Sequence, residues 1–246
     1  MPHLPSGYRL IALETIDSTN EEARRRAPLA HRTVIWAKQQ TAGRGRRGRA
    51  WMSKPGNLFT SIVVTPDCPI IEAAQLSFVT ALAMADMLKG LGLADKISLK
   101  WPNDVLVGGA KISGILLEAS SSGAEAKAVI VGIGLNLTLH PDDTPYPATD
   151  VRSLTGKAVP PEDALEALVA AFEEHYSAWC KTGFEPVRQA WLDQAHGRGQ
   201  PVSVTLDGEV LEGVFSDLDE TGALVVDTRE GPRTITAGDV FFAGEA

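Results

Sequence analysis

Hydrophobic positions recur along the chain with the period of strands in some segments and of helices in others. Strict alternation over 128–139 predicts a strand whose packed face carries Val129, Val131, Ile133, Leu135 and Leu137. The opposite face carries Gly132, Gly134 and Asn136, so its middle is nearly bare of side chains. Such a face is compatible with a ligand that fills the space and equally with close packing by a helix.

The same reading gives a mixed set of elements for the first 195 residues. Strands are predicted at 8–14, 33–40, 57–64 and 97–101, the last one stopped by Pro102. Helices are predicted after Asp17 or Ser18 and at 70–90, 161–180 and 184–195, with a proline-rich loop at 140–161.

A hairpin is predicted around Gly108-Gly109, with Lys111 at the start of its second strand. Gly114 interrupts that second strand. A glycine inside a strand is typical of a bulge or of a close approach by backbone or ligand. This hairpin therefore brings a lysine and a gap in the side-chain layer close together.

From about residue 198 the pattern changes to short β-rich runs separated by Asp-Gly, Thr-Gly and Glu-Gly-Pro turns. These runs predict a small antiparallel barrel of the SH3-like kind. We therefore expect an α+β protein with a mixed-sheet domain over 1–195 and a small C-terminal SH3-like β-barrel over 196–246.

Composition and charge narrow the possible functions. The 246 residues carry a formal net charge of −8, yet the first 50 contain ten Lys and Arg against four Asp and Glu. A basic pocket on an acidic body suits a small anionic ligand better than a nucleic-acid duplex. Cys68 and Cys180 show neither a disulfide framework nor metal-ligand spacing, which indicates a reducing cytoplasm. We expect no structural metal and, because no apolar run is long enough, no membrane span.

Residues 38–51, KQQTAGRGRRGRAW, concentrate this positive charge. Glycines at 43, 45 and 48 allow successive backbone N–H groups to point at one anion. The arginines add planar donors suited to phosphate or carboxylate, and Trp51 adds an apolar face. The pattern predicts a loop that closes over a ligand with an anionic and an apolar part. Short Arg-rich runs are also typical of nucleic-acid patches and of solvated surface.

Five motifs in a fixed order resemble those of the biotin–protein ligases, also called biotin–[acetyl-CoA-carboxylase] ligases. They are DSTN at 17–20, QQTAGRGRRGRAW at 39–51, KWPND at 100–104, KISGIL at 111–116 and GIGLN at 132–136. Each motif is weak alone, but the set is specific, and the small C-terminal barrel also fits. The resemblance implies a catalytic domain of the biotin/lipoate ligase type.

The chemistry implied by this resemblance has two steps. Biotin and ATP, with Mg²⁺, give biotinyl-5′-AMP and pyrophosphate. A lysine amine on a biotin carboxyl carrier protein or domain then takes the biotinyl group. Because adenylation brings two anions together, a fixed cation and an anion-binding loop should lower its barrier.

The resemblance also implies roles for individual residues. Lys111 is expected to be the main catalytic cation, with Arg46 beside it. The residues expected to bind biotin are Ser18, Thr19, Asn20, Gln40, Arg44, Gly45, Arg46, Trp51, Lys111, Gly114 and Gly132. Those expected to bind ATP are Arg46, Arg47, Arg49, Trp51, Asn103, Asp104, Lys111 and Asn136, and Asp104 is the candidate Mg²⁺ ligand.

Alternatives remain open on the sequence. Capping and turn formation would also account for Ser18, Thr19 and Asn20. A lipoate or octanoyl ligase shares the broad fold, although a dithiolane offers Ser18, Thr19 and Gln40 little to bind. A non-catalytic biotin or nucleotide sensor would not need Lys111, and an RNA-binding module would show interleaved aromatic residues.

Two expectations concern partners. Some family members carry an N-terminal winged helix, and about sixteen residues before the DSTN motif are too few for one, so no operator DNA binding is expected. The sheet edges near 111–137 are a possible homodimer surface.

Overall fold

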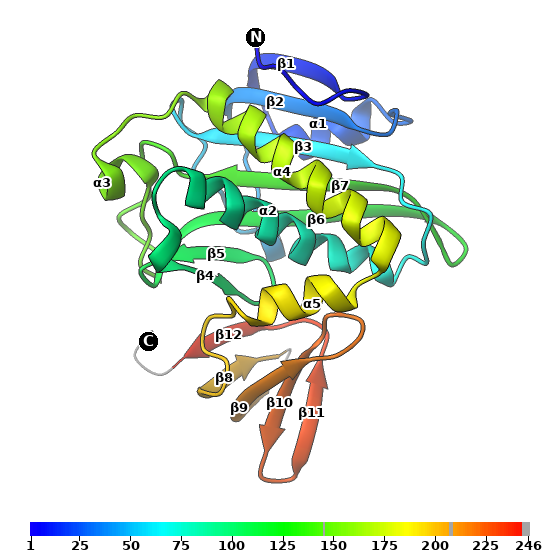
Figure 1. Ribbon diagram of the computed structural model, residues 1–246, viewed down its shortest axis with the longest axis vertical. Helices are drawn as coiled ribbons and strands as arrows, with labels where there is room; N and C mark the ends of the chain where they lie inside the picture. Colours follow the sequence, from blue (N-terminus) through cyan, green and yellow to red (C-terminus); the bar gives the residue numbers. More distant parts are fainter. Residues whose placement is uncertain (145, 207–208, 243–246) are drawn as a thin grey trace.

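A seven-stranded mixed sheet forms the larger part of the molecule (Figure 1). The computed structural model describes residues 1–144, 146–206 and 209–242. The strands are β1 (Arg9–Ile16), β2 (Thr33–Gln40), β3 (Leu58–Val64), β4 (Ile97–Lys100), β5 (Asp104–Val107), β6 (Ala110–Ser122) and β7 (Glu125–Leu135). Their order is β1-β2-β3-β7-β6-β5-β4, with β1 and β2 parallel and the other neighbours antiparallel. The predicted strands and the β5–β6 hairpin are confirmed.

Two long helices, α2 (Leu76–Gly90) and α4 (Pro161–Thr182), cover one face of this sheet (Figure 1). The face beneath them carries the alternating apolar residues of β7, which are buried in the main core. α4 begins with Pro161 and two acidic residues, as expected at the positive end of a helix dipole. Within the described residues no helix is both long and apolar enough to cross a lipid bilayer.

The opposite face is covered only in part, by the short helix α1 (Thr19–Arg25). Ala23 packs there against Ile35 and Val63. Ser18 is the N-cap residue of α1, so its backbone fulfils the predicted capping position, although its side chain makes no capping hydrogen bond. Because α1 has seven residues, it leaves the centre of this face available to other groups.

The segment 140–161, predicted as a loop, contains a five-residue helix, α3 (Val151–Thr155). Asp150 explains it, because its Oδ1 atom accepts a hydrogen bond from the backbone N–H of Ser153 at 2.7 Å. A polar cap and a glycine in the left-handed conformation at Gly156 are enough to bound one turn.

Helix α5 (Glu185–Leu192) leads into a second, antiparallel sheet. Its strands are β8 (Pro201–Thr205), β9 (Val210–Leu218), β10 (Leu224–Thr228), β11 (Gly231–Ile235) and β12 (Asp239–Phe242). Their order is β11-β10-β9-β8-β12. The predicted small antiparallel β-domain is therefore present, but pairing among the described residues does not close it into a barrel. Pro232 lacks an N–H group, which suits β11 to an edge rather than to closure. The division at residues 195 and 196 stays a prediction.

The two sheets are joined by specific contacts. The indole N–H of Trp101 donates to the carbonyl of Gly222 at 3.0 Å, and Arg188 Nε donates to the carbonyl of Leu218 at 2.7 Å. Phe78 of α2 packs edge-on against Trp191 of α5, with ring centroids 5.3 Å apart. These contacts hold the turn between β9 and β10 against the residue that follows β4, and they hold α5 against both α2 and β9.

Candidate active site

A cavity of about 330 Å³ lies on the partly covered face of the large sheet. It is lined by the start of α1, the end of β2, the arginine loop, the β4–β5 turn, β6, β7, the segment after β7 and the start of β12. Nearly all predicted site residues line it: Ser18, Thr19, Asn20, Gln40, Arg44, Gly45, Arg46, Arg49, Trp51, Asn103, Asp104, Lys111, Gly114, Gly132 and Asn136. Within the described part of the chain, Arg47 is the predicted site residue that does not.

One end of the cavity is built from uncharged polar groups. Gln40, at the end of β2, accepts the backbone N–H of Thr19 on its Oε1 atom at 2.9 Å. Its amide nitrogen donates to the Ser53 hydroxyl, which in turn donates to the carbonyl of Trp51, each at 2.9 Å. These bonds fix the Gln40 amide against both α1 and the arginine loop.

The bare glycine face is occupied by side chains of the chain itself. A Cβ atom on Gly134 would lie 2.4 Å from the Trp51 indole, and one on Gly114 would lie 3.0 Å from the same ring. A Cβ atom on Gly132 would lie 2.3 Å from Asn20 Oδ1. The close approach at Gly114 is therefore made by a side chain, that of Trp51, and not by backbone or ligand as predicted. The bulge lies elsewhere in the same hairpin, opposite Val105 and Leu106 of β5.

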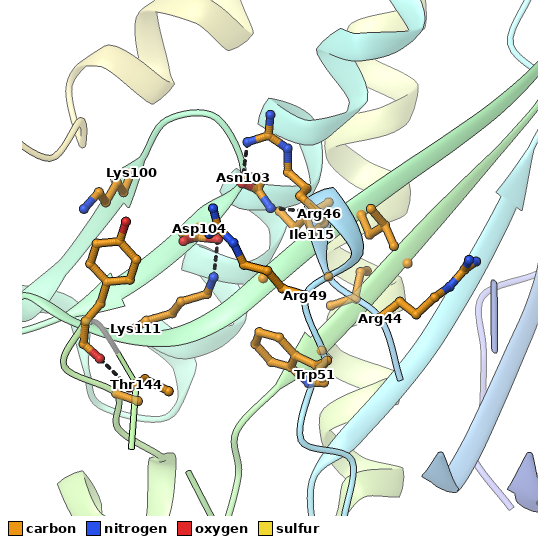
Figure 2. Close-up of a pocket in the computed structure, with 18 of the residues that line it drawn as sticks. Arg44, Arg46, Arg49, Trp51, Lys100, Asn103, Asp104, Lys111, Ile115 and Thr144 are labelled. Carbon is orange, nitrogen blue, oxygen red and sulfur yellow. Dashed lines mark hydrogen bonds and ion pairs between the residues drawn. The ribbon is translucent and has the colours of Figure 1, made fainter. Parts of the chain in front are cut away.

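The other end of the cavity is cationic. Figure 2 shows Lys111 and Asp104 pointing toward each other, with Lys111 Nζ 2.7 Å from Asp104 Oδ1. Lys111 Nζ also lies 5.5 Å from the centroid of the Trp51 ring. Arg46 Nη1 donates to Asn103 Oδ1 at 3.4 Å, and Asn103 Nδ2 donates to the carbonyl of Ile115 at 2.7 Å. One lysine and one arginine therefore approach the same space from two different motifs.

Burial lowers the pKa of the Arg46 guanidinium from its usual value, and the carboxylates of Asp239 and Asp104 act in the opposite direction. Arginine stays charged in proteins in spite of such shifts. A guanidinium that has lost part of its hydration has more to gain from an anionic ligand than an exposed one.

The other arginines of the loop are held by carboxylates outside it. Arg47 Nη1 lies 2.9 Å from Asp239 Oδ2, and Arg49 pairs with the same carboxylate. Arg44 pairs with Glu21 and lies 3.5 Å from Glu118, so it points away from Lys111 (Figure 2). The loop is thus tied to α1, to β6 and to the C-terminal sheet at once.

Comparison with known proteins agrees with this geometry. Residues 12–136 match the biotin/lipoate A/B protein ligase family, and residues 198–243 match the biotin protein ligase C-terminal domain. A biotin–[acetyl-CoA-carboxylase] ligase of Paracoccus denitrificans is 43% identical over 240 residues, which cover 94% of this chain and all of that protein. The chain belongs to the biotin protein ligase family.

Solved structures of other biotin protein ligases share its fold. The enzyme from Aquifex aeolicus in complex with biotin and ATP is 28% identical, with a TM-score of 0.84 over 96% of this chain and 99% of that one. The enzyme from Leishmania major in complex with biotinyl-5-AMP is 26% identical, with a TM-score of 0.63 over 93% of this chain and 99% of that one.

The segment after β7 holds the backbone of Lys111 in the ligase fold. The Lys111 N–H donates to the carbonyl of Pro147 at 2.8 Å, and the N–H of Thr149 donates to the Lys111 carbonyl at 2.9 Å. Asn136, predicted near the nucleotide, is buried, and its Nδ2 atom donates to the carbonyl of Thr149 at 3.0 Å. Its amide therefore supports this segment as well as lining the cavity.

Sequence reasoning missed several residues that line the cavity or contact its predicted residues, among them Ser61, Glu118 and Asp239. Ser61 and Glu118 bond to Asn20, and Asp239 pairs with the arginine loop. None of them belongs to a recognisable motif, and each meets its partner only through the tertiary fold.

A magnesium ion would find few protein ligands here. Among the residues that the structure describes, no group of three or more His, Cys, Asp or Glu side chains could hold a metal. Mg²⁺ is commonly bound through one or two carboxylates together with substrate phosphates. Asp104 in the cavity is compatible with an ion of that kind, held mainly by a nucleotide.

Proposed function

We propose that this ligase activates biotin with ATP as biotinyl-5′-AMP and transfers the biotinyl group to a lysine of a biotin carboxyl carrier domain. One observation carries the proposal. A single cavity joins an uncharged polar end at Thr19 and Gln40 to a cationic end at Lys111 and Arg46, with the Trp51 indole between them. The uncharged polar end suits the ureido ring of biotin, the Trp51 indole suits its apolar chain, and the cationic end suits its carboxylate.

In the first step, a carboxylate oxygen of biotin forms a bond to the α-phosphorus of ATP. The bond from that phosphorus to the bridging oxygen breaks, and pyrophosphate leaves with the electron pair. Lys111 and Arg46 offset the repulsion between the two anions. Preorganised charges of this kind stabilise the charge that develops in a transition state.

Two further arginines of the loop, Arg47 and Arg49, bind the departing phosphates in this proposal. To do so, Arg47 and Arg49 exchange Asp239 for phosphate oxygens, which are the stronger ligands because they carry more charge. Mg²⁺ belongs to the proposal as a charge-neutralising ion on the phosphates, with Asp104 as its protein ligand.

In the second step, the acceptor lysine amine attacks the acyl carbon and AMP leaves, while the nitrogen loses a proton. We assign no covalent enzyme intermediate. The acceptor in this proposal is a lysine of a biotin carboxyl carrier domain.

Location and assembly complete the proposal. The free thiols of Cys68 and Cys180 are consistent with a reducing cytoplasm. A homodimer could use the edge of β6, since β5 pairs with it only over residues 110–114. Sedimentation velocity with and without biotin plus ATP tests this assembly.

The direct test of function is incorporation of labelled biotin into a purified biotin carrier domain. We expect incorporation that needs ATP and that a tenfold excess of lipoate does not reduce. Incorporation of lipoate instead would identify the sister activity, and tight biotin binding without any incorporation would identify a sensor.

A further inference from the structure

Ser61 lies in the middle of β3, fully buried and behind the wall of the cavity. Its hydroxyl oxygen is 2.6 Å from Asn20 Oδ1 and 2.7 Å from Thr19 Oγ1. Both partners line the cavity, but Ser61 itself does not. A buried hydroxyl between two site residues raises the question of which way its single proton points.

The orientation of the Asn20 amide decides whether Asn20 can accept the Ser61 proton. Its nitrogen lies 2.8 Å from Glu118 Oε2 and 3.4 Å from the carbonyl of Leu116. A carboxylate and a carbonyl can only accept, so the nitrogen must face them and the oxygen must face Ser61. Gly132 pairs with Ser61 across β3 and β7, and its missing side chain gives the amide room to lie there.

Three oxygen–oxygen contacts then compete for two hydroxyl protons. They are Ser61 to Asn20 at 2.6 Å, Ser61 to Thr19 at 2.7 Å and Thr19 to Gln40 Oε1 at 3.2 Å. Two oxygens without a proton between them repel most at the shortest distance, so the 3.2 Å contact is the one left without a proton. Ser61 therefore donates to Asn20, and Thr19 donates to Ser61.

This arrangement leaves two acceptors side by side in the cavity wall. Gln40 Oε1 is fixed toward Thr19 because it accepts the Thr19 backbone N–H at 2.9 Å, while Gln40 Nε2 donates to Ser53. The Thr19 hydroxyl already donates its hydrogen to Ser61, so its oxygen can act only as an acceptor toward a ligand. An N–H group of a ligand placed between Thr19 Oγ1 and Gln40 Oε1 would satisfy both oxygens at once.

We propose that Ser61 is a positioning residue that turns the Thr19 hydroxyl into an acceptor and thereby selects ligands whose ring carries an N–H group. The inference rests on the proposed function and names the property of biotin that this end of the cavity reads. A cyclic urea supplies the N–H. A dithiolane does not, and its binding would leave the oxygen of the buried Thr19 hydroxyl without a donor, which is costly.

The matched variants Ser61→Thr and Ser61→Val test this inference, because both add the same bulk and only the first keeps the hydroxyl. Isothermal titration should show biotin binding about tenfold or more weaker in Ser61→Val than in Ser61→Thr, as expected when a buried polar group loses its partner. Affinity for ATP should be equal in the two variants. Equal biotin affinities, or a parallel loss for biotin and ATP, would overturn the inference.

Glu118→Gln tests the same chain of hydrogen bonds from its partly exposed end. A glutamine amide can turn its nitrogen toward Asn20, so the whole chain of hydroxyl protons can reverse and Thr19 can donate to Gln40. Because Glu118 also contacts Arg44, the matched control is Glu21→Gln, which removes a partner of Arg44 and leaves Asn20 bonded as before.

We expect weaker biotin binding in Glu118→Gln than in Glu21→Gln. Equal affinities in this pair would contradict the inference even if the Ser61 variants did not fold. Failure of the proposed function can be distinguished from failure of this inference. It would appear in the wild-type protein as biotin binding without incorporation into the carrier domain.

Discussion

The Nζ atom of Lys111 lies 2.7 Å from Oδ1 of Asp104, and the two residues come from facing strands of one hairpin. Two bonds from the segment after β7 fix the backbone of this lysine, so its ammonium group has a defined place in the cavity. The ion pair holds a cation inside the cavity in which we propose that two anionic substrates bind. It also means that a phosphate or carboxylate must compete with Asp104 for the lysine.

Asp104→Asn should affect ATP more than biotin. The substitution removes the carboxylate assigned to magnesium and frees Lys111 at the same time. We expect the KM for ATP to rise about tenfold, an effect that excess Mg²⁺ cannot restore, while the KM for biotin stays within twofold. Initial rates over a magnesium series measure both, and a change confined to biotin would contradict the assignment.

Gly134→Ala should disturb the Trp51 indole, because the new methyl group would lie 2.4 Å from that ring. Trp51 sits on a loop, so it can move away, and the expected result is loss of about tenfold in biotin affinity rather than unfolding. Gly90→Ala is the matched control, since a Cβ atom there meets nothing within 4 Å. Equal biotin affinities in the two variants would exclude a role for Trp51 packing.

Asp239→Asn should loosen the arginine loop. Asp239 holds Arg47 and Arg49 across the boundary between the two sheets. Hydrogen exchange over residues 43–50 should become faster in the variant at low salt, and the difference should shrink at high salt because partly exposed ion pairs are screened. Asp227→Asn, at an exposed position of β10, serves as the control. Unchanged exchange would show that the pairs do not restrain the loop.

Glu173 should make folding stability sensitive to acid. Burial alone would raise the pKa of Glu173, but the Arg32 guanidinium and the hydroxyls of Ser177 and Tyr8 outweigh it and hold that pKa below its usual range. A carboxylate whose pKa is lower in the folded state stabilises the fold above the unfolded value of about 4.3, and this contribution is lost as pH falls through the folded pKa.

The free energy of unfolding of Glu173→Gln should therefore be lower than that of wild type at pH 7, and the gap should narrow below about pH 4. Urea titrations at a series of pH values measure the gap. Glu174→Gln, at the exposed neighbouring position, should show no such narrowing. A gap that stays constant with pH would contradict the role given to Glu173.

Local signals predicted most of the individual elements. The β-branched run at Thr33–Gln40 forms the expected strand, and Gly108 and Gly109 take positive φ values of 60° and 80° in the expected hairpin turn. The order of the strands was not predictable, because it depends on contacts between distant segments. The open form of the second sheet was missed for the same reason. All four residues of β12 pair with β8, a strand more than 30 residues earlier in the chain, and sequence patterns do not reveal such a pairing.

The site was predictable to the extent that its residues stand in motifs. Lys111, Asn103 and Asp104 lie in short sequence patterns and meet in one cavity. Ser61 resembles any serine in an apolar strand, and its partners are 41 and 42 residues away. The packing of Trp51 over Gly134 was equally hidden, because a bare glycine face does not reveal which side chain covers it.

The measurement that tests the central claim most directly is biotin-dependent exchange of labelled pyrophosphate into ATP, compared between wild type and Lys111→Ala. The exposed residue Lys127 provides the control Lys127→Ala. We expect exchange that needs biotin, ignores lipoate and falls about 100- to 1,000-fold in Lys111→Ala, the loss typical of removing one preorganised stabilising group. Exchange that persists unchanged in Lys111→Ala would contradict its role as the cation of adenylation.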